Sequence, residues 1–246
     1  MCALKDIEAK DRIIVALDCS AKEALQLADS LSGKATWLKI GMTLFYKEGP
    51  AFVQALKDKG FKIFVDLKIY DIPFQAAGAA RSVVLSGADM FTLHASGGSE
   101  MMQGIAQITR EFEPEPPVSL GVTVLTSMDD STLQELNISK QAAEQVCDLA
   151  RLVQKSGISG VVASPQEAAQ LRELLGPDAY IVTPGVRPAG AALDDQKRVA
   201  TPYNAIAQGA SHIVVGRPIT KAEDPIEAFD AIVAEIASIK LEDWRW

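Results

Sequence analysis

The chain has 246 residues, of which 48% are hydrophobic and 6% are aromatic, and it carries a formal net charge of −8. This composition can bury a substantial core, and we expect a single domain over residues 1–246. The negative charge argues against a broad nucleic-acid-binding surface, although a small anionic ligand needs only a local basic pocket. The three cysteines lack metal-binding spacing, no apolar run could span a bilayer, and the N-terminus has no apolar signal core. We therefore expect a reduced, cytoplasmic protein with no membrane segment.

Short apolar stretches alternate with helical stretches along the chain. The expected strands are 13–18, 36–41, 64–69, 90–94, 118–124, 160–164, 180–183 and 212–216. The helices expected among them are 21–31, 49–57, 74–86, 99–112, 139–155, 165–175, 202–208 and 225–239, with Ser20 and Ser139 as N-caps and a polar insertion over 127–138. Eight strand-then-helix units with uniformly apolar strands predict an α/β fold of the (β/α)8 TIM barrel type. A doubly wound open sheet is the alternative, because the sequence does not show closure.

The third expected strand carries charges where an apolar core strand would have none. Because strand side chains alternate, Phe64, Asp66 and Lys68 share one face of it. Burying such an acid and base is unfavourable unless they pair or meet a ligand. Asp71 adds another carboxylate just where Pro73 ends the strand. Two acids and a base therefore lie within one strand end and its loop.

In a barrel, the carboxyl ends of all the strands face a common pocket. The residues at these ends are Asp18, Lys39, Asp66 with Lys68, His94, Thr123 to Ser127, Ser164, Pro184 to Arg187, and Gly216 with Arg217. A structural ion-pair network at the barrel mouth is the alternative for any one of these charges. For all of them together a functional site is favoured, because several desolvated charges at one mouth contribute little to stability. His94 could act as a general base, although we expect a hydrogen-bonded residue behind this site. We expect His212, at the opposite mouth, to be structural.

Two loops after the last strands indicate an anion site. Residues 184–188 form a turn that contains Arg187, and residues 215–219 place the amide of Gly216 beside the guanidinium of Arg217. Barrels often bind phosphate at this position, so the expected ligand is a phosphate ester, although either loop alone could be an ordinary turn. Gln196, in the loop from 189 to 199, could fold over such a ligand.

Taken together, these residues resemble a known family, orotidine 5′-phosphate decarboxylase in its bacterial form, over nearly the whole chain. The most specific part is an Asp-x-Lys-x-x-Asp signature, here Asp66-Leu67-Lys68-Ile69-Tyr70-Asp71-Ile72-Pro73. The other matching motifs are Val15 to Asp18, Leu38 to Gly41, Leu93 to Ala95, Gly121 to Ser127, Thr183 to Pro188 and Val215 to Pro218. Each motif alone is weak, whereas their order and spacing together are specific.

The resemblance implies a cofactor-free enzyme that converts orotidine 5′-phosphate to uridine 5′-monophosphate and CO2 in pyrimidine biosynthesis. It implies a charge array at the reacting carbon made of Lys39, Asp66, Lys68 and Asp71, in which Lys68 donates the proton. It also implies a homodimer in which Asp71 and Ile72 complete the neighbouring subunit's site.

The same resemblance assigns substrate contacts residue by residue. By this resemblance, Asp18 and Lys39 bind the ribose hydroxyls, and Thr126 binds the pyrimidine. The phosphate is bound by Gln196, Gly216 and Arg217, with Arg187 at the same end. The segment assigned to the substrate is Asp66, Leu67, Lys68, Ile69, Tyr70, Asp71, Ile72, Pro73, Phe74 and Gln75. The last pair departs from the family, which usually has Asn-Thr there. This chain therefore lacks the threonine hydroxyl that reaches the neighbour's ligand.

The charges also fit the chemistry on physical grounds. Loss of CO2 from C6 of orotate leaves an electron pair in the ring plane, which a cofactor-free enzyme must stabilise electrostatically. The Lys68 ammonium could do this and then donate the proton, because the flanking carboxylates keep it charged despite burial.

Two other functions compete with decarboxylation of orotidine 5′-phosphate. A sugar-phosphate lyase or decarboxylase of the same superfamily uses Mg²⁺ bound by a glutamate, where this chain has Lys39. Because a lysine would repel a divalent ion, we expect no metal. A non-catalytic barrel that binds phosphoribosyl ligands would explain Gly216 and Arg217, but it gives no reason for Lys68 buried between two acids.

Overall fold

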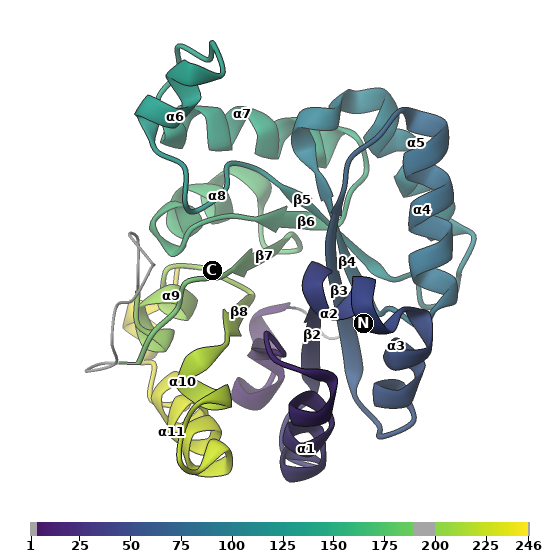
Figure 1. Ribbon diagram of the computed structural model, residues 1–246. Helices are drawn as coiled ribbons and strands as arrows, with labels where there is room; N and C mark the ends of the chain where they lie inside the picture. Colours follow the sequence, from purple (N-terminus) through teal and green to yellow (C-terminus); the bar gives the residue numbers. More distant parts are fainter. Residues whose placement is uncertain (1–3, 189–199, 246) are drawn as a thin grey trace.

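In the computed structural model, which describes residues 4–188 and 200–245, parallel strands close into a barrel (Figure 1). The strands are β1 Ile13–Ala16, β2 Trp37–Gly41, β3 Lys62–Ile69, β4 Met90–His94, β5 Val118–Val122, β6 Gly160–Val162, β7 Tyr180–Thr183 and β8 His212–Val215. Each strand pairs with the next one along the chain, and β8 pairs with β1. The predicted (β/α)8 barrel is confirmed, and this last pairing rules out the open sheet.

Helices cover the outside of the barrel (Figure 1). They are α1 Ala21–Leu31, α2 Met42–Glu48, α3 Pro50–Lys57, α4 Pro73–Leu85, α5 Gly98–Arg110, α6 Asp130–Glu135, α7 Ala142–Lys155, α8 Ala168–Leu175, α9 Pro202–Ala207, α10 Arg217–Thr220 and α11 Pro225–Ala237. Short 3-10 turns cover Leu4–Asp6, Ala9–Arg12, Ala95–Gly97, Pro165–Glu167 and Leu241–Asp243. Within the described part of the chain, every helix is too short or too polar to cross a membrane.

Helix boundaries agree with the sequence where a cap is present and differ where it is not. Ser20 caps α1 in a capping box with Glu23, as predicted. The prediction of Ser139 as a cap was wrong, because α7 begins only at Ala142, after Gln141. Two short helices were also missed. The first, α2, directly follows β2 without a side-chain cap, and the second, α10, begins at Arg217.

The alternation of strand side chains divides the core into two layers. Inside the barrel lie Ile14, Ala16, Trp37, Phe64, Met90, Leu120, Val182 and Val214. Their neighbours along the strands, such as Val15 and Leu38, face outward and pack under the helices. Because Ala16 and Trp37 point inward, Asp18 and Lys39, two residues further on, point into the upper mouth of the barrel. The core therefore sets the direction of the charged residues at the strand ends.

His212 closes the opposite mouth of the barrel as a structural residue, in agreement with the sequence. The residue is 2% exposed, and its ring stacks on that of Tyr180 at 5.7 Å between centroids and lies nearly perpendicular to that of Trp37 at 6.0 Å. Burial lowers the pKa of His212 to about 3, with a further contribution from the positive charges of Arg12 and Lys62. The folded protein therefore holds this imidazole neutral.

We expect His212 to make folding sensitive to acid. Between its ordinary pKa of 6.5 and the folded value of about 3, the unfolded chain binds a proton that the folded chain does not, so stability falls as the pH falls. The loss is about 1.4 kcal/mol per pH unit within this window. Urea unfolding from pH 7 to pH 4 should give a shallower pH dependence for His212→Gln than for the wild type. Equal slopes for the His212 variant and the wild type would contradict the prediction.

Candidate active site

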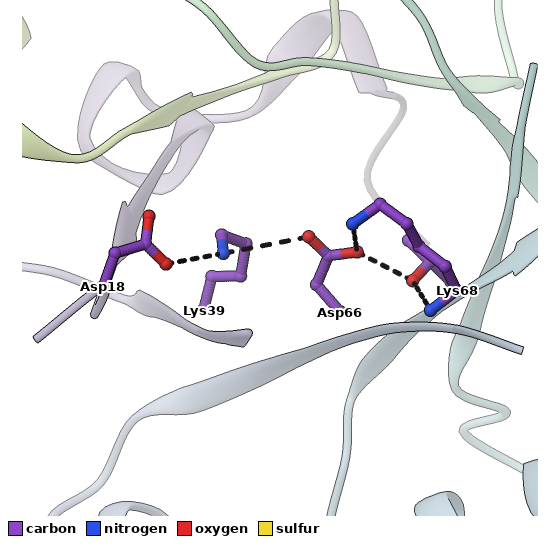
Figure 2. Close-up of polar contacts among 5 residues, drawn as sticks. Asp18, Lys39, Asp66 and Lys68 are labelled. Carbon is purple, nitrogen blue, oxygen red and sulfur yellow. Dashed lines mark hydrogen bonds and ion pairs between the residues drawn. The ribbon is translucent and has the colours of Figure 1, made fainter. Parts of the chain in front are cut away.

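A row of alternating charges crosses the upper mouth of the barrel (Figure 2). Lys39 Nζ lies 3.2 Å from Asp18 Oδ1 and 3.7 Å from Asp66 Oδ2, and Lys68 Nζ lies 3.0 Å from Asp66 Oδ1. The side chain of Asp66 is 17% exposed and that of Lys39 is 10% exposed, whereas Asp18 is 66% exposed. The inner part of the row is therefore a largely desolvated carboxylate held between two ammonium groups.

Neighbouring strands bring these charges together. Lys39 comes from β2 and Asp66 from β3, and the parallel register sets Gly41 beside Asp66. A Cβ atom at Gly41 would lie 3.3 Å from Lys39 Nζ and 3.4 Å from Asp18 Oδ1. The glycine therefore leaves room for the lysine head group at the strand end.

Lys68 reaches Asp66 by a backbone that alternation alone does not predict. The pairing of β3 with β4 shifts register between Val65 and Ile69, and Lys68 has a φ of 54°. A lysine in this left-handed region is unusual and unfavourable by about 1 kcal/mol or more. The expected contact between Asp66 and Lys68 is present, but a bulged strand end makes it.

Opposing effects set the protonation of the site. Burial on its own would raise the pKa of Asp66, but the charges of Lys39 and Lys68, with hydrogen bonds from Lys68 and Thr92, outweigh it and lower that pKa. Burial, together with the charge of Lys68, also lowers the pKa of His94, whose ring centroid lies 5.5 Å from that of Tyr70. At neutral pH the site therefore contains an ionised Asp66 beside a neutral imidazole.

Three adjoining cavities open above this row, and both Lys39 and Asp66 line all of them. One, of about 190 Å³, is largely apolar and includes Lys68 and Thr126. The second, of about 420 Å³, includes Arg187 and the other residues of the expected anion site, Asp18, Gly216 and Arg217. The third, of about 520 Å³, runs past Asp18 toward Met42, Thr43 and Lys47 of α2. Together they can hold an elongated ligand with an anionic end and an apolar end.

The anionic end is built from the loops after β7 and β8. Arg187 is 8% exposed, and its Nε has no hydrogen-bond partner among the described residues. A buried, unpaired guanidinium nitrogen is unfavourable unless a ligand accepts its hydrogen bond. Thr220 lines the same cavity and was not foreseen, because α10 was missed. Gln196 lies outside the described residues.

The second half of the signature segment points away from these cavities. Asp71 is exposed and accepts a hydrogen bond from its neighbour, the Ile72 amide, at 2.7 Å. Large apolar side chains beside it are also exposed, with Tyr70 at 62%, Ile72 at 65% and Phe74 at 83%. Pro73 begins α4, and Gln75 is exposed on it. None of these residues lines the three cavities, so one chain brings together Lys39, Asp66 and Lys68 without Asp71.

The remaining residues of the segment serve the core. Ile69 is buried, and Leu67 packs against the outer layer between barrel and helices. In the described ranges 4–188 and 200–245, no three His, Cys, Asp or Glu side chains are grouped so that they could hold a metal ion.

Comparison with known proteins identifies the family of this chain. The sequence model of the family described as "Orotidine 5′-phosphate decarboxylase / HUMPS family" matches residues 11–232. A relative from Moorella thermoacetica, named orotidine 5′-phosphate decarboxylase, is 48% identical over 240 residues, or 95% of each chain. The crystal structure of orotidine 5′-phosphate decarboxylase from Lactobacillus acidophilus is 38% identical, with a TM-score of 0.82 over 93% of this chain and all of that one. That from Pyrococcus horikoshii is 25% identical, with a TM-score of 0.75 over 92% of this chain and 100% of the other.

Proposed function

Because the chain belongs to the orotidine 5′-phosphate decarboxylase / HUMPS family, we propose that it converts orotidine 5′-phosphate to uridine 5′-monophosphate and CO2, without a cofactor. The observation that carries this proposal is the desolvated row of Lys39, Asp66 and Lys68 beside an apolar cavity. The proposal includes one barrel domain for the whole chain, a cytoplasmic location and a role in pyrimidine biosynthesis.

Lys68 is the proposed proton donor. When the bond from C6 to the carboxylate breaks, its electron pair stays on C6 in the plane of the ring, and a fixed ammonium nearby lowers the energy of that charge. Asp66, whose Oδ1 lies 3.0 Å from Lys68 Nζ, holds the ammonium group in place until the carbanion forms. The Lys68 proton then moves to C6, and CO2 leaves as a neutral molecule.

The substrate's remaining groups match the other cavities. Its phosphate would accept hydrogen bonds from Arg187, whose Nε lacks a partner among the described residues, and from Gly216 and Arg217. Asp18 and Lys39 would bind the ribose hydroxyls between the two ends, and Thr126 the pyrimidine. Binding energy from the phosphate, remote from C6, would hold the base against Lys68.

A homodimer would complete the site. Asp71 and Ile72 are exposed and lie outside the cavities of their own barrel, beside the exposed rings of Tyr70 and Phe74. Exposed apolar side chains grouped in this way are typical of an interface, and a two-fold dimer would present this segment to the neighbouring barrel. Asp71 would then add a second carboxylate to Lys68 of the partner.

We expect purified protein to decarboxylate orotidine 5′-phosphate in the presence of EDTA. The measurement is the change in ultraviolet absorbance as orotidine 5′-phosphate becomes uridine 5′-monophosphate, with product confirmed by chromatography. An absolute requirement for Mg²⁺ would instead support a metal-dependent relative, and binding of uridine 5′-monophosphate without turnover would support a non-catalytic barrel. Either result would overturn the proposal.

Lys68→Ala should lower kcat at least about 10³-fold, because both the electrostatic stabilisation and the proton are lost. Binding of uridine 5′-monophosphate, measured by calorimetry, should stay within about tenfold of the wild type, because the phosphate contacts remain. Lys22→Ala, at an exposed lysine on α1, is the matched control and should leave both values unchanged. Turnover retained by the Lys68 variant would remove this residue from its assigned role.

Two inactive variants should restore activity when mixed. Lys68→Ala lacks the proton donor of its own barrel, and Asp71→Ala lacks the carboxylate given to the partner's barrel. A mixed dimer then has one site with both residues intact, so random exchange should recover up to about a quarter of wild-type activity. The measurement is turnover after the subunits have been dissociated and reassociated. If activity fails to rise above that of the separate variants although mixed dimers form, the shared site is disproved.

A further inference from the structure

Thr92, in the middle of β4, stands opposite the bulge of β3. The register pairs Val65 with Phe91 and then Ile69 with Leu93. The chain therefore advances four residues along β3 while it advances two along β4. Three residues of β3, Asp66 to Lys68, therefore face Thr92 alone. Its side chain is 1% exposed and lines none of the three cavities at the barrel mouth, so it does not meet the ligand.

The Thr92 hydroxyl joins the two ends of this bulge. The backbone amide of Lys68 donates a hydrogen bond to Thr92 Oγ1 at 2.9 Å, and Thr92 Oγ1 donates one to Asp66 Oδ1 at 2.8 Å. A hydroxyl has one proton to donate and two lone pairs to accept with, so both bonds can form at once. The same oxygen of Asp66 receives Lys68 Nζ at 3.0 Å.

These two bonds fix the features on which the charge row depends. The bond to Oδ1 sets the rotation of the Asp66 carboxylate, which keeps Oδ2 toward Lys39 and Oδ1 toward Lys68. The bond from the Lys68 amide holds a lysine backbone at a φ of 54°, a conformation that persists only where its surroundings impose it. If the hydroxyl is removed, the backbone amide of Lys68 loses this acceptor and the carboxylate of Asp66 can rotate more freely.

We propose that Thr92 is a positioning residue, whose hydroxyl holds Asp66 and the bulged backbone of Lys68 in the arrangement that aims the ammonium at the reacting carbon. This inference rests on the proposed decarboxylation. The proposed role requires the hydroxyl and not the branched shape of threonine. Valine has a similar branched shape but can form neither hydrogen bond.

The test compares Thr92→Val with Thr92→Ser. The substitution to valine should lower kcat about 10- to 100-fold and leave KM within about threefold of the wild-type value. A misplaced proton donor affects the chemical step more than the binding of phosphate and ribose. The serine variant, which keeps the hydroxyl, should stay within about threefold of the wild type in both values. Thr92→Ala, which also removes the hydroxyl, repeats the comparison if the valine variant folds poorly, as judged by circular dichroism and thermal unfolding.

A second readout does not depend on turnover. In Thr92→Val the backbone amide of Lys68 should exchange its hydrogen at least about tenfold faster than in the wild type, whereas in Thr92→Ser it should remain protected. Wild-type kcat in the valine variant, or a serine variant as slow as the valine variant, would overturn the role of the hydroxyl. If the wild type does not decarboxylate the substrate, the proposed function fails by itself. Amide exchange then still decides whether Thr92 holds the bulge.

Discussion

The Asp66 carboxylate, shared between Lys39 and Lys68, is the interaction on which the upper mouth of this barrel depends. The half-buried Asp66 faces the buried Lys39 and the half-buried Lys68, so the inner part of the row has an excess of one positive charge. Asp18, the other acid of the row, is mostly exposed, and water screens its contribution. An excess positive charge in a poorly solvated pocket is unfavourable until an anion enters. Because Arg187 lines a second cavity beside this row, the site therefore favours a ligand that carries negative charge at more than one place.

The position of Lys68 is costly for the strand that carries it. A regular β3 would keep its register with β4 and hold Lys68 in extended geometry, whereas the bulge places this residue in the left-handed region. The rest of the barrel compensates, because the neighbouring strand pairs keep a regular register and the apolar residues of the inner layer are buried. Bulges near functional sites re-aim a side chain in this way, at a local cost that the fold as a whole can carry.

Much of this arrangement could be predicted from the sequence, and the misses have physical reasons. The strand-helix rhythm and the apolar strands predicted the closed barrel, and strand alternation predicted that Asp66 and Lys68 would share one face of the third strand. The bulge could not be predicted, because it depends on pairing with β4. In the sequence, Thr92 of that strand resembles any other β-branched strand residue. Helix α2 was missed because it follows Gly41 without a capping side chain, and Ser139 was wrongly taken as a cap because its residue type alone does not determine where α7 begins.

The two halves of the signature segment obey different constraints. Asp66 and Lys68 lie within β3, so the barrel fixes them whether or not a partner is present. Asp71 follows the end of the strand, in an exposed turn before α4, where the described contacts of its carboxylate are local to the turn. The position of such a turn residue is fixed by whatever packs against it. The exposed side chains of Tyr70, Ile72 and Phe74 provide an apolar surface for such packing. The two residues after Pro73, Phe74 and Gln75, add an exposed ring and an exposed amide to this surface. In the proposed dimer, the position of the Asp71 carboxylate would therefore depend on association more than the positions of Lys39, Asp66 and Lys68 do.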